Sequence, residues 1–205
     1  MSDTPLADQI TATPIPADDE AAARFIHDVA ARASEAGLAD LVTLIESGGA
    51  AADLLRGIGA DSPYLSSLCL RDPEALWLSL SQSPDARLAQ ITDVLAAAMA
   101  TDEQKAAMHA LRQAKNRYAL CVALADLGGV FDLDRMMAMW SQAADTLLQH
   151  AVRFCLRRAS ARGKFQPADP EAPERDSGLI VLAMGKYGAG ELNYSSDIDL
   201  IVFYE

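Results

Sequence analysis

The sequence has few aromatic residues and no long apolar run, and both shortages limit the fold classes that it can adopt. Aromatic residues make up 6% of the 205 residues, whereas 51% are hydrophobic, with Ala and Leu abundant. Such a mixture favours packed helices over a β-sandwich. The longest strongly apolar helical run, Val94–Ala100, is far too short to cross a bilayer. We therefore expect a protein with a real core and no membrane partner.

Cysteine is also scarce. Cys69, Cys121 and Cys155 are an odd number without CxxC spacing, and each falls in an apolar helical pattern. They argue against a structural zinc site or a disulfide framework and fit a reducing compartment. The N-terminus lacks the basic and apolar regions of a signal peptide. We expect a cytoplasmic protein.

Basic residues are outnumbered, with 17 Lys and Arg against 29 Asp and Glu and a net charge of −12. An acidic chain repels phosphate backbones, so nucleic acid is not expected as a general partner. The local exception is a basic run that comprises Arg153, Arg157, Arg158, Arg162 and Lys164. Its simplest interpretation is favourable charge at a helix C-terminus, and phosphate or partner binding is the alternative.

Changes in periodicity divide the chain into four segments. Residues 1–17 contain three prolines and little periodicity, which indicates a loose leader. Residues 18–160 show helical periodicity throughout. Residues 161–178 are rich in Pro and Gly and form the expected linker, after which 179–205 begin a second domain. The predicted fold class is α+β, with a mostly α-helical N-terminal domain followed by the first strands of another.

Turn and capping residues locate the helices. Asp18 to Glu20 suit a helix start and Gly37 its end. Ser62-Pro63 and Asp72-Pro73 each begin a further helix, because Pro is tolerated at a first helical position. Residues 102–126 and 132–159 predict two long helices that pack as an antiparallel pair. The shorter helices, over 38–47 and 50–57, are expected to break at Gly48-Gly49 and at Gly57-Ile58-Gly59.

The period then changes to that of strands. Leu179–Met184 and Ile198–Tyr204 are short apolar runs that predict buried strands. On such a strand Asp197 and Asp199 point to one face, with Cα atoms about 7 Å apart. Their carboxylates are hard oxygen ligands that suit one or two Mg²⁺ ions. Ile198 and Leu200 are expected to point to the opposite face, into the core.

A glycine-rich turn precedes these aspartates. Gly185, Gly188 and Gly190 allow positive φ and close backbone approach. Backbone N–H groups in such a turn can hold phosphate oxygens. Lys186 adds a point charge toward a phosphate, and the expected hydrogen-bond donors at the same mouth are Ser195 and Ser196.

Spacing excludes other sites that use glycines or paired aspartates. A Walker A loop needs Gly at 180 and Ser or Thr at 187, where Ile180 and Tyr187 stand. A dinucleotide fingerprint from Gly188 needs Gly at 193, which is Asn193. An EF-hand from Asp197 needs Gly at 202, which is valine.

The residues resemble a known superfamily. Gly185, a spacer of about ten residues and then Asp197-Ile198-Asp199 are similar to the motif of the DNA polymerase β-type nucleotidyltransferases. The longer string MGKYGAGELNYSSDIDLIVFYE is similar to the bacterial glutamine synthetase adenylyltransferase/adenylyl-removing family. SPYLSSLCLRDPEAL (62–76) and LRQAKNRYALCVALADLGGVFDL (111–133) also resemble that family.

The resemblance implies a large enzyme with two nucleotidyltransferase halves. One half attaches AMP from ATP to a tyrosine of glutamine synthetase, and the other removes it by phosphorolysis, yielding ADP. The long helical leader resembles the adenylyl-removing half. Asp197 and Asp199 would hold Mg²⁺, while Gly185 and Lys186 would line the phosphates. A nitrogen-signalling protein is an implied regulatory partner.

The resemblance also implies that the site needs a third carboxylate on a later strand. No such strand occurs by residue 205, so we expect an N-terminal fragment that is inactive alone. Two alternatives stay open at this point. One is another Mg²⁺-dependent nucleotidyltransferase with a small-molecule substrate, and the other is a non-catalytic helical docking module.

Overall fold

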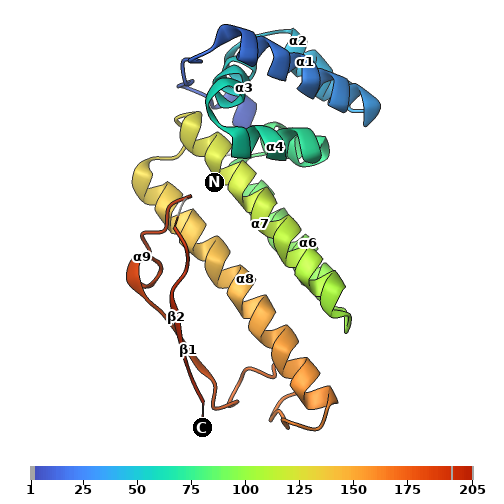
Figure 1. Ribbon diagram of the computed structural model, residues 1–205, viewed down its shortest axis with the longest axis vertical. Coiled ribbons are helices and arrows are strands. Elements are labelled where there is room, and N and C mark those ends of the chain that lie inside the picture. The colour runs from blue at the N-terminus through green and yellow to red at the C-terminus, as the bar shows by residue number, and fades with distance from the viewer. Residues whose placement is uncertain (1–2, 195, 205) are drawn as a thin grey trace. The chain divides into compact units, whose positions relative to one another are not determined.

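The computed structural model describes residues 3–194 and 196–204, and its helices far outnumber its strands (Figure 1). In chain order the elements are η1 (Leu6–Asp8), α1 (Asp19–Glu35), α2 (Ala39–Glu46), α3 (Ala50–Asp61), α4 (Pro63–Arg71), α5 (Pro73–Ser81), α6 (Pro84–Ala98), α7 (Gln104–Leu127), α8 (Leu133–Ala161), β1 (Ile180–Ala183), α9 (Gly185–Gly188) and β2 (Leu200–Phe203).

The chain forms two compact units. Unit 1 comprises Met1–Gln90 and Asn116–Leu133, and unit 2 comprises Ile91–Lys115 and Asp134–Glu205. The mostly helical content with a small sheet agrees with an α+β class, while the polymerase β-like domain and the predicted domain limits stay predictions. Among the described residues, no helix combines the length and hydropathy that a bilayer-spanning segment requires.

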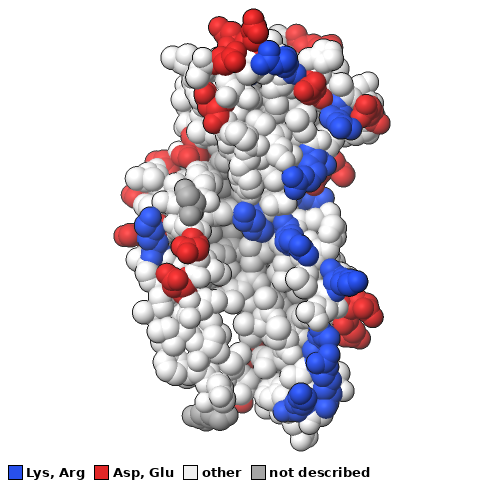
Figure 2. Space-filling view, in the orientation of Figure 1, with Lys and Arg blue, Asp and Glu red and all other residues white. Residues whose placement is uncertain are grey.

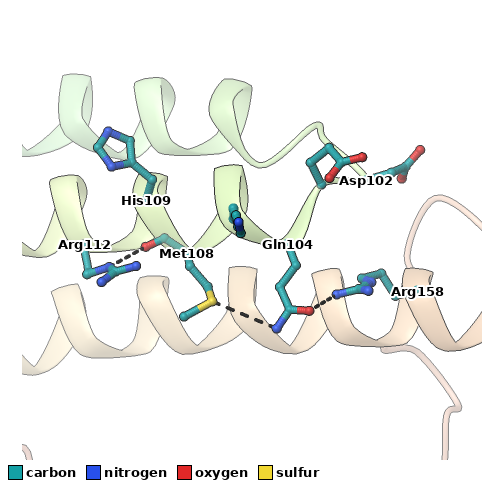
Figure 3. A pocket seen from close by; sticks show the side chains of 8 residues that line it. Asp102, Gln104, Met108, His109, Arg112 and Arg158 are labelled. Atoms are coloured by element: carbon teal, nitrogen blue, oxygen red, sulfur yellow. Dashed lines mark hydrogen bonds between the residues drawn. The ribbon is translucent and has the colours of Figure 1, made fainter.

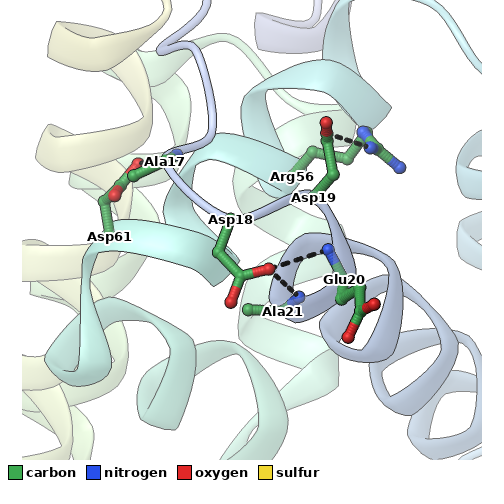
Figure 4. A network of polar contacts seen from close by, with 7 residues as sticks. All are labelled: Ala17, Asp18, Asp19, Glu20, Ala21, Arg56 and Asp61. Carbon is green, nitrogen blue, oxygen red and sulfur yellow. Dashed lines mark hydrogen bonds and ion pairs between the residues drawn. The ribbon is translucent and has the colours of Figure 1, made fainter.

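In unit 1, α1 begins where the acidic run predicted a helix start. Asp18 caps it, because Asp18 Oδ1 accepts hydrogen bonds from the N–H groups of Ala21 at 3.0 Å and Glu20 at 2.9 Å (Figure 4). These bonds lower the pKa of the Asp18 carboxyl, chiefly through Ala21. Asp19 pairs with Arg56 at 3.1 Å. The cap satisfies N–H groups that no carbonyl of the helix can reach.

The two Pro-initiated helices are confirmed. Ser62 Oγ accepts from Leu65 N at 3.3 Å ahead of α4, and Asp72 Oδ1 accepts from Ala75 N at 3.0 Å ahead of α5. The second oxygen of Asp72 pairs with Arg117 Nε at 3.1 Å. The carboxylate therefore caps α5 and also ties it to α7.

The predicted break at Gly57-Ile58-Gly59 is wrong, since α3 continues to Asp61. A Cβ added to Gly57 would lie 2.5 Å from the carbonyl oxygen of Pro14, and one added to Gly59 would lie 2.4 Å from the Phe25 ring. These glycines permit close packing rather than a bend. Part of the leader that was predicted to be loose also packs on this unit, because Leu6 is fully buried and its N–H donates to Gln82 O at 2.8 Å.

The core of unit 1 is mostly aliphatic. Its fully buried members come from several helices and include Leu41, Leu54, Leu55, Leu76 and Leu124. Cys69 and Cys121 lie in this core as free thiols, and burial raises the pKa of each to about 12. Cys155 of unit 2 is free and exposed.

Unit 2 is organised along α8. The start of α7 runs beside the end of α8, where Arg158 Nη1 donates to Gln104 Oε1 at 2.6 Å, and Arg157 donates to the carbonyl of Met99. The predicted antiparallel pairing of these helices is confirmed here. Arg153 Nε donates to Glu174 Oε2 at 3.1 Å and so ties the 161–178 segment to α8. That bond lowers the pKa of Glu174.

β1 and β2 form an antiparallel pair in which Ile180 faces Phe203 and Ala183 faces Leu200. Both are shorter than predicted. The prediction that they are buried is wrong, because Ile180, Val202 and Phe203 are 54%, 53% and 51% exposed. Ile198, expected in the core, is 45% exposed. Within the described residues no helix or further strand covers these side chains, and a two-stranded ribbon has no interior of its own.

Candidate functional site

A hollow of about 440 Å³ in unit 2 gathers the residues that the motif predicted. Its lining consists of Met184, Gly185, Lys186, Asn193, Ser196, Asp197 and Asp199. Gly185 and Lys186 of the glycine turn therefore share one hollow with the paired aspartates, although Lys186 and Asp197 are eleven positions apart in sequence. Ser195, which was predicted to lie at the same mouth, falls outside the described residues.

Backbone conformation and close packing explain why glycine is required at three positions of the turn. Gly185 and Gly190 have φ of 56° and 73°, where side chains other than hydrogen are strained. At Gly188 an added Cβ would lie 2.4 Å from the carbonyl oxygen of Ala183, so the turn packs directly on β1. The N–H groups of Gly188 and Gly190 donate to Met184 and Tyr187 carbonyls, at 3.0 Å each. These N–H groups are thus not available to a phosphate, contrary to the expected cradle at those positions.

Asp197 and Asp199 precede β2 rather than lying on it. The main chain nevertheless continues the strand pairing, because Met184 N donates to Asp199 O at 2.9 Å. That bond sets Asp199 beside the turn, and its Oδ2 lies 3.7 Å from where a Cβ of Gly185 would be. Both aspartates are exposed to solvent. In the part of the chain that the structure describes, no Lys or Arg forms an ion pair with either carboxylate.

This donor set fits Mg²⁺. The ion takes oxygen ligands, keeps several waters, and is commonly held by one or two carboxylates together with substrate phosphates. Two exposed carboxylates without a cationic partner, facing one hollow, provide that arrangement. Among residues 3–194 and 196–204 no cluster of three acidic, His or Cys side chains suits a metal. The remaining coordination positions would then belong to water, phosphate or a further residue.

The other predicted site residues take different positions. Lys186 is exposed at the mouth of the hollow, where its ammonium can approach a phosphate. Ser196 lines the hollow, but its hydroxyl donates to Asn193 Oδ1 at 2.8 Å. The Ser196 N–H donates to the Asn193 carbonyl at 3.1 Å. Ser196 therefore fixes the loop before the aspartates, and the donor predicted for a phosphate is used within the protein.

Sequence reasoning missed the residues of α8 that hold this loop. Trp140 Nε1 donates to the Asn193 carbonyl at 2.9 Å. One residue later, Ser141 Oγ accepts from Leu192 N at 3.3 Å. The Trp140 ring also contacts the Tyr194 ring, with centroids 6.0 Å apart. Trp140 is buried, and a buried indole N–H needs an acceptor, which was the available signal.

A further α8 contact holds the glycine turn. The Tyr187 hydroxyl donates to Asp145 Oδ1 at 2.7 Å, and Tyr187 itself is buried. Burial and this hydrogen bond raise the pKa of the Tyr187 phenol. The hydroxyl therefore stays protonated and remains a donor at ordinary pH. Nothing in the spacing of Asp145 along its helix distinguishes it from other exposed carboxylates.

Most of the chain, including the residues that line the hollow, matches known proteins. Residues 52–205 match the family model described as glutamate-ammonia ligase adenylyltransferase. The chain belongs to this family. No solved structure matches it.

Several relatives of this chain are described as bifunctional enzymes. The bifunctional glutamine synthetase adenylyltransferase/adenylyl-removing enzyme of Rhodopseudomonas palustris (strain HaA2) is 47% identical over 152 residues, which are 74% of this chain and 15% of that protein. The enzyme of the same description from Bradyrhizobium diazoefficiens is 47% identical over 154 residues, 75% and 16% of the two chains. That of Bartonella henselae is 37% identical over 189 residues, 91% and 19%. This chain thus spans less than a fifth of the length of these relatives.

Proposed function

We propose that this chain is the part of an adenylyl-removing enzyme that begins its nucleotidyl-transfer site. Asp197 and Asp199 are the proposed metal ligands, and Gly185 and Lys186 the proposed phosphate-binding residues. The observation that carries the proposal is the shared hollow, which places both carboxylates beside the glycine turn. The names of the relatives suggest the substrate, an adenylylated glutamine synthetase.

The residues would divide the work as follows. Asp197 and Asp199 hold the cation through oxygen ligands, at a place where solvent and substrate can reach them. A Mg²⁺ ion held there would supply positive charge beside the phosphorus of the transferred adenylyl group. Lys186 supplies a second positive charge toward the phosphate. Gly185 leaves room for it, because a Cβ there would point at Asp199 Oδ2, only 3.7 Å away.

The proposed direction of reaction is AMP removal by phosphorolysis. The AMP–tyrosine bond of the protein substrate breaks, inorganic phosphate bonds to the AMP phosphorus, and ADP leaves. The tyrosine oxygen takes up a proton. The helical residues that precede the motif support the adenylyl-removing half, because the resemblance places a long helical leader before the first site. We also propose that a carboxylate from a longer chain completes the site and that this chain alone is inactive.

The test uses full-length protein that contains these residues, with adenylylated glutamine synthetase, Mg²⁺ and phosphate. Asp197→Asn and Asp199→Asn should each lower the rate of ADP formation by about 100-fold, because each removes an anionic oxygen ligand of the proposed Mg²⁺. Glu191→Gln is the matched control, since Glu191 is an exposed carboxylate of the same loop that does not line the hollow. It should keep the activity of the unaltered protein.

Circular dichroism should show the same fold for every variant. Unchanged ADP formation in both aspartate variants would reject the proposed site and favour a docking role for these residues. Release of AMP in the absence of phosphate would reject phosphorolysis but would leave the proposed site in place.

A further inference from the structure

A groove between α7 and α8 in unit 2 lies apart from the residues of the proposed catalytic site. It has a volume of about 410 Å³, and both helices contribute to its lining. We call it the α7–α8 groove and define it by Ala107, Leu111, Phe154, Arg158, Arg162 and Lys164. The neighbouring hollow in Figure 3 shares Gln104, Met108 and Arg158 with it, so the depression extends along α7.

The floor of the groove is apolar. Ala107 of α7 and Phe154 of α8 are buried beneath it, and Leu111 is half-buried. Small side chains at Ala107 and Ala151 keep the space between the helices open. Met108 stands 47% exposed at the edge, where a flexible thioether can adapt to a ligand. Such a floor suits the apolar face of an amphipathic helix.

The rim on the α8 side is basic. Arg158, Arg162 and Lys164 line the groove, and its lining includes no carboxylate. Arg158 is held in place, because it donates to Gln104 Oε1 at 2.6 Å and lies 5.6 Å from the centroid of the Phe154 ring. Arg162 and Lys164 are exposed and form no ion pair within the described residues. Figure 2 shows Lys and Arg side chains gathered near the end of α8.

The basic rim contrasts with the chain as a whole, whose net charge is −12. Asp102 and Glu103 belong only to the neighbouring hollow at the start of α7. The basic rim favours acidic groups on a ligand, and the apolar floor favours apolar groups. A ligand that carries both kinds of group fits the groove best. A nucleic acid lacks the apolar face, and the charge of the whole chain opposes a long polyanion.

We infer that the α7–α8 groove docks an acidic amphipathic segment of the protein substrate. This inference rests on the proposed function for the identity of that substrate. The acidic side chains of the segment meet Arg158, Arg162 and Lys164, and its apolar side chains cover Phe154 and Leu111. The groove would then contribute to binding of the protein substrate without touching the reacting phosphate.

The test reverses the rim charge in the full-length protein. Arg162→Glu with Lys164→Glu should raise KM for adenylylated glutamine synthetase by about tenfold and leave kcat unchanged, because rim charges act on association rather than on chemistry. Arg24→Glu with Arg175→Glu is the matched control, with the same change in net charge at exposed residues outside the groove. It should leave KM unchanged.

A second measurement does not depend on turnover. Cys155 is exposed and lines the groove, so its rate of alkylation by N-ethylmaleimide, read by peptide mass spectrometry, reports occupancy. Adenylylated glutamine synthetase should slow the labelling several-fold, and the reversed-rim variant should lose that protection. If the unaltered protein removes no AMP, the proposed function fails, and Cys155 protection alone decides the docking inference.

Particular outcomes would overturn the inference. They are an unchanged KM together with unchanged Cys155 labelling, protection by duplex DNA instead of glutamine synthetase, or protection that grows with the concentration of this protein alone. The second result would assign the groove to a polyanion, and the third to a second copy of the chain.

Discussion

Unit 1 and the β1–β2 pair of unit 2 differ in how far their apolar side chains are exposed to solvent. In unit 1 most large aliphatic residues are enclosed, and Leu54 and Leu124 are fully buried, with Ile15 an exception at 90% exposure. In the strand pair Ile180 and Val202 are more than half exposed. The first region is therefore stabilised by its own core. The second is held through hydrogen bonds from the site loop to α8, which makes its position depend on a few polar contacts.

The largest expected effect contrasts the two regions directly. Leu124→Ala should lower the free energy of unfolding by about 2–5 kcal/mol, because it opens a cavity in the core of unit 1. Val202→Ala should change it by about 0.5 kcal/mol or less, because that side chain is already solvated. Urea unfolding followed by circular dichroism measures both. Equal losses would remove the distinction between the regions.

A second contrast uses the same steric overlap in both places. Gly59→Ala brings a Cβ to 2.4 Å from the Phe25 ring and should destabilise unit 1 by about 1–3 kcal/mol. Gly188→Ala meets the Ala183 carbonyl at the same distance, but it should mainly disturb the glycine turn. Amide hydrogen exchange over residues 185–192 should accelerate only in Gly188→Ala. Global unfolding in both variants would show that the turn is part of a common core.

Removal of one anchoring hydroxyl should have a smaller, local effect. Tyr187→Phe deletes the donor to Asp145 and should weaken the attachment of the turn by about 1 kcal/mol. Hydrogen exchange at 185–192 should then rise about fivefold, with little change in the unfolding midpoint of unit 1. Tyr204→Phe is the control, because Tyr204 is 83% exposed. Equal exchange in both variants would mean that α8 does not hold the turn.

The smallest effect concerns the Asp18 cap and depends on pH. The folded state lowers the pKa of Asp18, so the cap stabilises the fold above the ordinary pKa of 3.8 and loses that contribution as pH falls through the lowered value. Asp18→Ala should lower Tm at pH 7, and the difference from the unaltered protein should vanish in stronger acid. Asp18→Asn, which keeps an acceptor, should lower Tm less. A difference that is independent of pH would contradict the role of the carboxylate charge.

Local chemistry allowed much of the helical region to be predicted. Ser62-Pro63 and Asp72-Pro73 begin helices because caps and Pro act on their immediate neighbours. Gly57 and Gly59 misled the prediction because their role depends on Pro14 and Phe25, which are distant in sequence. Local propensity does not depend on residues that are distant in sequence, so it could not predict these contacts.

The site shows the same division. The spacing of Gly185 from Asp197 and Asp199 predicted residues that the structure gathers in one hollow. The partners of Trp140, Ser141 and Asp145 could not be predicted, because these contacts arise when α8 packs against the loop. The strands were predicted to be buried because their composition is apolar, yet composition does not show whether anything covers them.

The central claim is that Asp197 and Asp199 hold a divalent cation beside the glycine turn. Iron-directed cleavage of the full-length protein tests it most directly, because Fe²⁺ in an oxygen-ligand site generates radicals that cut the nearby backbone. With Fe²⁺ and peroxide, we predict cuts within residues 185–190 and 197–199 that Mg²⁺ suppresses and that Asp197→Asn with Asp199→Asn abolishes. Cuts that persist in that variant, or an unaltered protein that is not cut in these segments, would contradict the claim.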